Sequence, residues 1–188
     1  MLSGKPEKPT TAGYGILLAV AAMLGCSTQP QEPLPATIVQ QEATLQIVAL
    51  NPEKVIDGQT VYVPVYSHIY HHNSPRNAVN LSATLSIRNT DPEHAIVITS
   101  VRYFNSEGEL IRQDITEPSK LGPLASVSFF VAANDISGGA GANFLVDWVT
   151  ETAASEPVIE AVMISTTSSQ GISFVSPGRV VARRKVAP

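Results

Sequence analysis

Alternation of apolar and polar side chains is clearest in the segment NLSATLSIRN, residues 80–89. One face carries Leu81, Ala83, Leu85 and Ile87, and the other carries Ser82, Thr84, Ser86 and Arg88. A period of two sustained over such a run predicts a β-strand with one buried face. The next segment, Asn89–Glu93, predicts a turn, because proline fixes one backbone angle and Asn and Asp side chains bond to nearby backbone.

Several short apolar runs follow, separated by clusters of Gly, Pro, Asn and Ser. Ala95–Phe104 leads through the loop Asn105–Gly108 into the run ELIRQ, which predicts a hairpin. Four further strands are expected at Ala125–Ala132, Ala142–Val149, Val158–Thr166 and Gly171–Ser176. Because no amphipathic helix separates these runs, we expect an all-β fold: an antiparallel β-sandwich, immunoglobulin-like, with seven to nine strands.

The run Ala142–Val149 is apolar on both alternating faces, which is typical of a central, well-covered strand. Asp147 is its polar exception. Trp148 has two interpretations, a core anchor or a ligand-stacking surface, and its large area favours the core.

The N-terminus has the features of a signal peptide, with two lysines before the apolar run Gly15–Leu24. That run is too short to cross a bilayer as a helix, which needs roughly 20 apolar residues. We therefore expect residues 1–25 to be cleaved.

The only cysteine follows this run directly, in the segment MLGC, Met23–Cys26. The segment resembles the lipobox of bacterial lipoproteins, although Met23 stands where leucine is usual. The resemblance implies that Cys26 carries the lipid and becomes the mature N-terminus, anchoring a domain at a membrane surface. The alternative is an ordinary signal peptide in which Cys26 is incidental. With Cys26 lipidated, no thiol remains for a disulfide or a nucleophile.

Composition divides the rest of the chain. Residues 26–43 are rich in Pro and Gln and are expected to be a disordered tether. Residues 44–181 form the predicted β-sandwich domain, and residues 182–188, with the basic cluster Arg183–Lys185, are expected to be a solvated tail. The whole chain has a net charge of −4, and removal of residues 1–25 makes it about −5, which argues against nucleic acid as a partner.

The segment Val61–His72 carries the most conspicuous side chains. As one continuous strand it would place Tyr62, Tyr66 and Tyr70 in a one-sided row, which is a candidate surface for a partner protein or a glycan. The candidate binding residues are Tyr62, Tyr66, His68, Tyr70, His71 and His72.

For the histidines, a structural or hydrogen-bonding role is favoured over simple exposure to solvent. The alternative is a metal site, with His68, His71, His72 and, from another loop, His94 as candidate ligands. On a straight strand His68 and His72 would lie about 13 Å apart, and His71 would face the other side. A shared ion therefore requires a bend near Ile69 and the arrival of His94.

Other motifs give weaker signals. The glycine-rich segment Ser137–Phe144 lacks the lysine of a phosphate-binding loop and leads into a strand, so we interpret it as a tight structural loop. No Gly-x-Ser-x-Gly elbow occurs, and the two acids in Asp114–Pro118 are typical of a solvated loop. We therefore expect no enzymatic activity and no cofactor.

The run of segments VYVPVYSHIY, LSATLSIRNTD, ITSVRYFNSEGELIR, GGAGANFLVDW, EAVMIST and QGISFVSPGRV resembles the bacterial domain-of-unknown-function 3124 family. The resemblance covers residues 59–181. It implies a secreted or lipid-anchored envelope protein and supplies no catalytic or binding residues.

Together these features predict a bacterial cell-envelope lipoprotein at the periplasmic or extracellular face of a membrane. Its domain is expected to be a non-catalytic binding or structural module with an envelope protein or glycan as partner. The alternatives are a metal-binding envelope protein that uses the histidine cluster and a hydrolase with a dispersed site.

Overall fold

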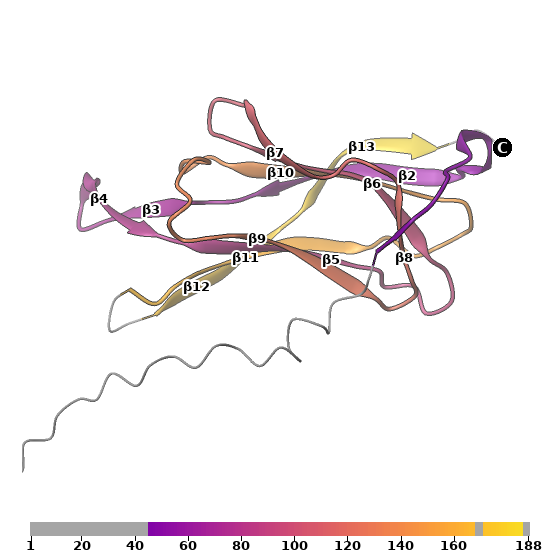
Figure 1. Cartoon of the computed structure of the whole chain (residues 1–188). Helices are drawn as coiled ribbons and strands as arrows, with labels where there is room; N and C mark the ends of the chain where they lie inside the picture. Colours follow the sequence, from indigo (N-terminus) through magenta and orange to yellow (C-terminus); the bar gives the residue numbers. More distant parts are fainter. Residues whose placement is uncertain (1–44, 168–170, 186–188) are drawn as a thin grey trace, which may run out of the picture. The chain divides into compact units, whose positions relative to one another are not determined.

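Figure 1 shows the computed structural model of the chain, which describes residues 45–167 and 171–185. All the described residues belong to one compact unit. The predicted signal peptide, Cys26 and the predicted tether lie outside the described residues.

The described part is built almost entirely of antiparallel strands, with one 3-10 turn, η1 (Pro52–Lys54). No helix in this part is long and apolar enough to cross a membrane. Its thirteen strands are β1 (Gln46–Ile47), β2 (Asp57–Pro64), β3 (His68–His71), β4 (Ser74–Asn80), β5 (Ser82–Arg88), β6 (Ile96–Phe104), β7 (Leu110–Ile115), β8 (Ser119–Leu121), β9 (Ser126–Val131), β10 (Asn143–Thr150), β11 (Val158–Ser165), β12 (Ile172–Pro177) and β13 (Arg179–Lys185). The all-β fold class is confirmed, whereas the expected seven to nine strands are too few, because several short strands have no clear alternation.

Two sheets form the layers of a sandwich (Figure 1). The larger sheet has the order β1-β8-β6-β10-β2-β13, with β7 also paired to β6, and the smaller sheet has the order β12-β11-β5-β9. Strands β3 and β4 make a separate hairpin between β2 of the larger sheet and β5 of the smaller one. Figure 1 shows this hairpin extending beyond the end of the larger sheet.

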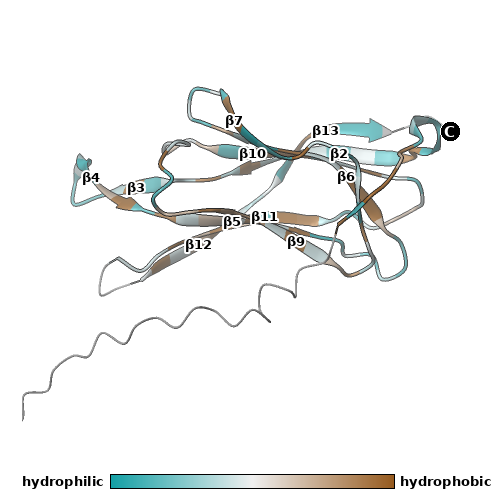
Figure 2. Ribbon diagram, in the orientation of Figure 1, coloured by the Kyte–Doolittle hydropathy of each residue, from teal (hydrophilic) through white to brown (hydrophobic). Residues whose placement is uncertain are grey.

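The core lies between the two sheets and follows the alternation read from the sequence. In β5, Ala83, Leu85 and Ile87 are fully buried while the intervening side chains are half-buried or exposed. Trp148 of β10 is only 1% exposed and belongs to the same cluster, which confirms its interpretation as a core anchor. In Figure 2, hydrophobic segments run through the layer of β5, β9 and β11, whereas β13 is largely hydrophilic. Burial of one tryptophan side chain contributes roughly 4–6 kcal/mol of transfer free energy.

The turn between β5 and β6 is held by Asn89, which is almost fully buried. Its side-chain amide donates hydrogen bonds to the backbone oxygens of His94, Leu121 and Gly122, at 2.8, 3.3 and 2.9 Å. The predicted turn is therefore confirmed, and its asparagine also fixes the loop after β8.

Asp91 connects the same turn to a third loop. Its carboxylate accepts backbone N–H groups from Glu93 and His94 at 2.9 and 2.7 Å, and from Ser155 in the β10–β11 loop at 2.8 Å. These backbone bonds, led by the one from Ser155, hold the pKa of Asp91 well below its usual range. One charged side chain thus joins two loops at this end of the sandwich.

The structure corrects the prediction of a solvated basic tail at residues 182–188. Residues 182–185 belong to β13, which pairs with β2 through Val180–Val61 and Ala182–Thr60 and has a bulge between those pairs. Arg183 is ion-paired with Glu156 at 2.6 Å. Charged residues are common on edge strands because they discourage pairing with other chains, so the basic composition concealed a strand. Residues 186–188 lie outside the described residues.

Substitution of Asp91 by asparagine is expected to lower the melting temperature at pH 7 and to have less effect in acid. The folded pKa is lowered, so the stabilisation is complete above the unfolded pKa of about 3.9 and is lost as the pH falls toward the folded value. Thermal unfolding of both proteins from pH 7 to pH 2 should show converging curves below pH 4. The exposed Glu107→Gln variant is the control, and a constant difference at all pH values would contradict this role for the Asp91 charge.

Candidate functional site

The β3–β4 hairpin contains most of the candidate residues predicted from the sequence. His72 and Asn73 form its turn, with φ angles of 51° and 54°. Positive φ at both central residues is typical of the tight turns that join antiparallel strands. His71 pairs with Ser74 across this turn, so the chain reverses direction directly after the first of the two adjacent histidines.

The segment Val61–His72 is not one continuous strand. β2 ends at Pro64 and β3 begins at His68, so the chain leaves the larger sheet at residues 65–67 and not near Ile69. Ile69 itself lies inside β3, paired with Val79. The one-sided tyrosine row therefore does not form.

The three tyrosines occupy different places. Tyr62 is half-buried in β2, and Tyr66 packs edge-on against Phe174 of β12 with ring centroids 6.0 Å apart. Tyr70 lies on the hairpin, is 55% exposed, and contacts His68 edge-on at 5.3 Å. Tyr70 and the three histidines therefore all lie on the hairpin. Tyr66 lies in the segment that joins β2 to the hairpin, and Tyr62 lies in the larger sheet.

His68 is engaged by its neighbours through both ring nitrogens. Its Nδ1 is 3.1 Å from the hydroxyl of Ser67, and its Nε2 is 3.4 Å from the hydroxyl of Tyr70. This arrangement orients His68 along the hairpin and gives it a structural role.

His94 lies far from the hairpin. It lies just before β6, which begins at Ile96. The other end of β6 is the one near the hairpin, because Phe104 pairs with Asn143 and Asn143 pairs with Pro64 at the end of β2. The nine residues of β6 span about 30 Å. His94 instead faces Asp91, with its Nδ1 at 3.2 Å from the carboxylate, so a site shared by His94 and the hairpin histidines does not form.

Within residues 45–167 and 171–185, no three His, Cys, Asp or Glu side chains lie close enough to hold one metal ion together. Of the four candidate histidines, His71 and His72 lie side by side, with ring centroids 4.1 Å apart. They line an open hollow at the hairpin tip with Tyr70, Asn73, Ser74 and Pro75.

The glycine-rich loop holds the base of the hairpin. The backbone N–H and the hydroxyl of Ser67 both donate to the carbonyl oxygen of Gly139, at 3.1 and 2.9 Å. Gly139 has a φ of 72°, a conformation that favours glycine. The interpretation of this loop as structural is supported by these bonds, which replace a strand pairing at the point where the chain leaves β2.

The same loop also covers the buried Tyr103. A Cβ atom at Gly138 would overlap the Tyr103 hydroxyl and would lie 2.7 Å from the Cβ of Ala142. The Tyr103 hydroxyl is buried without a hydrogen-bond partner, and burial raises the pKa of Tyr103. Glycine at 138 is therefore required by packing.

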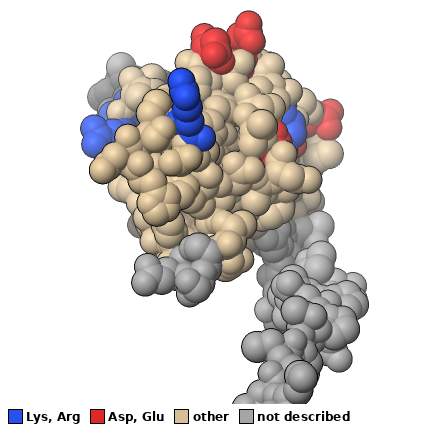
Figure 3. Space-filling model, turned by 90° about the vertical axis from the view of Figure 1, so that its left-hand side faces the viewer, with Lys and Arg blue, Asp and Glu red and all other residues tan. Residues whose placement is uncertain are grey.

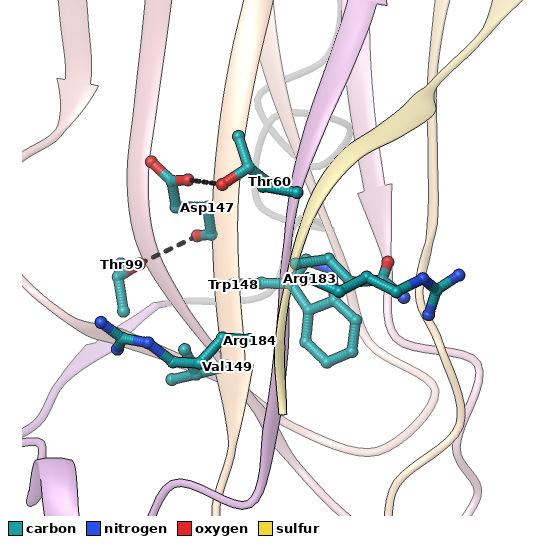
Figure 4. A pocket seen from close by; sticks show the side chains of 9 residues that line it. Thr60, Thr99, Asp147, Trp148, Val149, Arg183 and Arg184 are labelled. Carbon is teal, nitrogen blue, oxygen red and sulfur yellow. Dashed lines mark hydrogen bonds between the residues drawn. The ribbon is translucent and has the colours of Figure 1, made fainter. Parts of the chain in front are cut away.

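A second group of polar residues lies on the outer face of the larger sheet. The sequence indicated only one of its members, Asp147. Asp147 of β10 accepts a hydrogen bond from the Thr60 hydroxyl at 2.6 Å (Figure 4). Its other carboxylate oxygen is ion-paired with Arg102 at 2.7 Å. Thr99 donates to the backbone oxygen of Asp147 at 3.2 Å. Both carboxylate oxygens are occupied, so this cluster fastens β2, β6 and β10 together. Its sequence signal was the lone acid in an apolar strand.

A groove runs beside this cluster, bordered by β2, β6, β10 and the edge strand β13. Ala182 lines it, and Arg183 and Arg184 project to opposite sides of β13 (Figure 4). Arg183 is already paired with Glu156, so one of the two arginines has a structural partner.

Comparison with known proteins decides the family. Residues 58–181 match the family model described as "Protein of unknown function (DUF3124)", which is more than half of the chain. The chain belongs to the DUF3124 family. The hairpin, the Asp147 cluster and the glycine-rich loop all lie within the part that matches DUF3124.

No curated protein matches this DUF3124 chain. Among solved structures it is similar to one described as "Crystal Structure of Thermotoga maritima 1070", with 11% sequence identity and a TM-score of 0.40, over 64% of this chain and 92% of that chain. A likeness this weak carries no argument about the DUF3124 fold or function.

Substitution of Gly138 by alanine is expected to destabilise the domain by about 1–3 kcal/mol, because the new methyl group must displace the Tyr103 ring. Adding Tyr103→Phe should recover part of that loss, since it removes the overlapping hydroxyl and leaves no hydrogen bond broken. Urea unfolding measures each change. Gly122→Ala is the matched control, with nothing within 4 Å of its Cβ, and equal effects at positions 122 and 138 would contradict the packing argument.

Proposed function

We propose that this DUF3124 protein is a lipid-anchored component of the bacterial cell envelope, facing the periplasm or the exterior, whose β-sandwich is a non-enzymatic binding module. The β3–β4 hairpin makes the contact with the partner. The observation that carries the proposal is the projection of this hairpin beyond the larger sheet with Tyr70 mostly exposed at its side. Tyrosine is enriched at the centres of protein interfaces because its ring buries a large area and its hydroxyl can still bond.

The surface around the hairpin supports contact with a neutral partner surface. Figure 3 views the molecule from the end that carries the hairpin and shows mostly uncharged residues, with basic side chains at the left and acidic side chains at the top and right. Depletion of charge and enrichment of aromatic residues are typical of interface cores.

The shape of the hairpin favours a protein over a glycan as partner. Glycan and small-molecule sites are usually concave, with a ligand enclosed by several elements. This hairpin is convex, and the hollow at its tip is open and formed by six consecutive residues, Tyr70–Pro75. A projecting two-stranded element is suited to insertion into a groove of another envelope protein.

The anchor in this proposal rests on the sequence MLGC and on the tether of residues 26–43. The physical reason is that two acyl chains hold a soluble domain stably at a membrane, whereas one chain gives only marginal binding.

A hydrolase gains no support from the carboxylates. Both oxygens of Asp147 are occupied, and Asp114 has one oxygen ion-paired with Arg112 at 2.7 Å and the other buried away from solvent. A general base needs a carboxylate free to approach a substrate proton.

The test is photo-crosslinking in intact cells with a benzophenone amino acid in place of Tyr70. We expect a discrete crosslinked protein that is absent when the same group replaces Phe130, which is 60% exposed on the smaller sheet and serves as the matched control. Crosslinks that are the same from both positions, or a product sensitive to glycan-cleaving enzymes and not to proteases, would overturn the protein-partner proposal.

The Cys26→Ser variant tests the anchor in the same cells. The unaltered chain should fractionate with membranes and show an acylated N-terminal cysteine by mass spectrometry, and the variant should be soluble with a lower crosslinking yield. An unacylated N-terminus in the unaltered protein would contradict the anchor without bearing on the hairpin.

A further inference from the structure

We infer that His71 and His72 form a two-imidazole binding site for a divalent transition-metal ion, with Cu²⁺ as the ion bound most tightly. The inference rests on the hairpin being the binding surface proposed above, because the remaining coordination positions of the ion face away from the domain, toward a partner. Imidazole is a good ligand for copper, nickel and zinc, and affinity within this series is highest for Cu²⁺.

The first argument is the distance between the rings. Their centroids are 4.1 Å apart with an angle of 57° between the planes. Two imidazoles that bind one ion through bonds of about 2.0–2.1 Å at right or tetrahedral angles have centroids roughly 4.5–5 Å apart. A small rotation of two side chains at an open hollow reaches that geometry.

The second argument is that the turn creates this proximity. Adjacent residues of an extended strand point to opposite faces, so His71 and His72 could not meet within β3. The positive φ of His72 reverses the chain between them and brings both rings to the same hollow.

The other histidines do not contribute ligands. Both ring nitrogens of His68 face hydroxyl groups, and His94 lies at the opposite end of the sandwich beside Asp91. Since the described residues supply no third ligand nearby, the ion keeps open positions for water or for a side chain of the partner. The site is therefore one of reversible binding, unlike a closed structural metal site.

The variant His72→Asn tests the site without disturbing the fold, because asparagine is at least as well suited as histidine to positive φ. The full-length, untagged chain is titrated with Cu²⁺ and followed by calorimetry and electron paramagnetic resonance. We expect one saturable ion with nitrogen ligands, and binding that is roughly tenfold or more weaker in His71→Asn and in His72→Asn. The controls, His68→Asn and His94→Asn, should bind as the unaltered chain does.

Two results would overturn the inference. The first is the absence of saturable binding of one Cu²⁺. The second is an affinity reduced equally by all four substitutions, which would indicate an adventitious ion only. Crosslinking from position 70 with and without a chelator separates this inference from the proposed function. Crosslinks without stoichiometric Cu²⁺ binding would leave the binding module standing and end the metal site. Stoichiometric binding without crosslinks would leave the metal site and end the proposed partner contact.

Discussion

The departure of the chain from the larger sheet at residues 65–67 is the constraint on which the projecting hairpin depends. A continuous strand would have kept this segment in the sheet and spread its aromatic side chains along one face. The double hydrogen bond from Ser67 to Gly139 fixes the departure, and Leu81 donates its N–H to the Ser67 carbonyl at 2.9 Å, which closes the base of the hairpin. β3 and β4 are therefore free to project and to form a turn at His72 and Asn73.

The two ends of the sandwich are held by different chemistry. At the hairpin end, backbone carbonyls of a glycine-rich loop receive the bonds, and little charge is involved. At the other end, Asn89 and the carboxylate of Asp91 join three loops. Between them the sheets share one apolar core, and the outer Asp147–Arg102 pair fastens neighbouring strands of the larger sheet. Charged side chains thus contribute to stability mainly away from the hairpin.

Local patterns in the sequence were sufficient for the strands and the turn that depend on near neighbours. The alternation in Leu81–Ile87, the burial of Trp148 and the Asn89–Glu93 turn all follow from side chains within a few residues. The break before His68 could not be predicted, because its stabilising partner, Gly139, lies 72 residues away in the sequence. The strand β13 was hidden by its arginines, and the separation of His94 from the hairpin depends on the register of three strands. Pairings over long sequence distances are set by the whole fold, and local propensity does not contain them.

Amide hydrogen exchange at Ser67 tests most directly whether the bonds between Ser67 and Gly139 fix the base of the hairpin. Its N–H donates to Gly139 in the native hairpin base, so it should exchange as slowly as the amides of β5 and much faster when Gly138→Ala displaces the loop. Rapid exchange at Ser67 in the unaltered domain, at the rate of the exposed β6–β7 loop, would contradict the claim that this junction fixes the projecting hairpin.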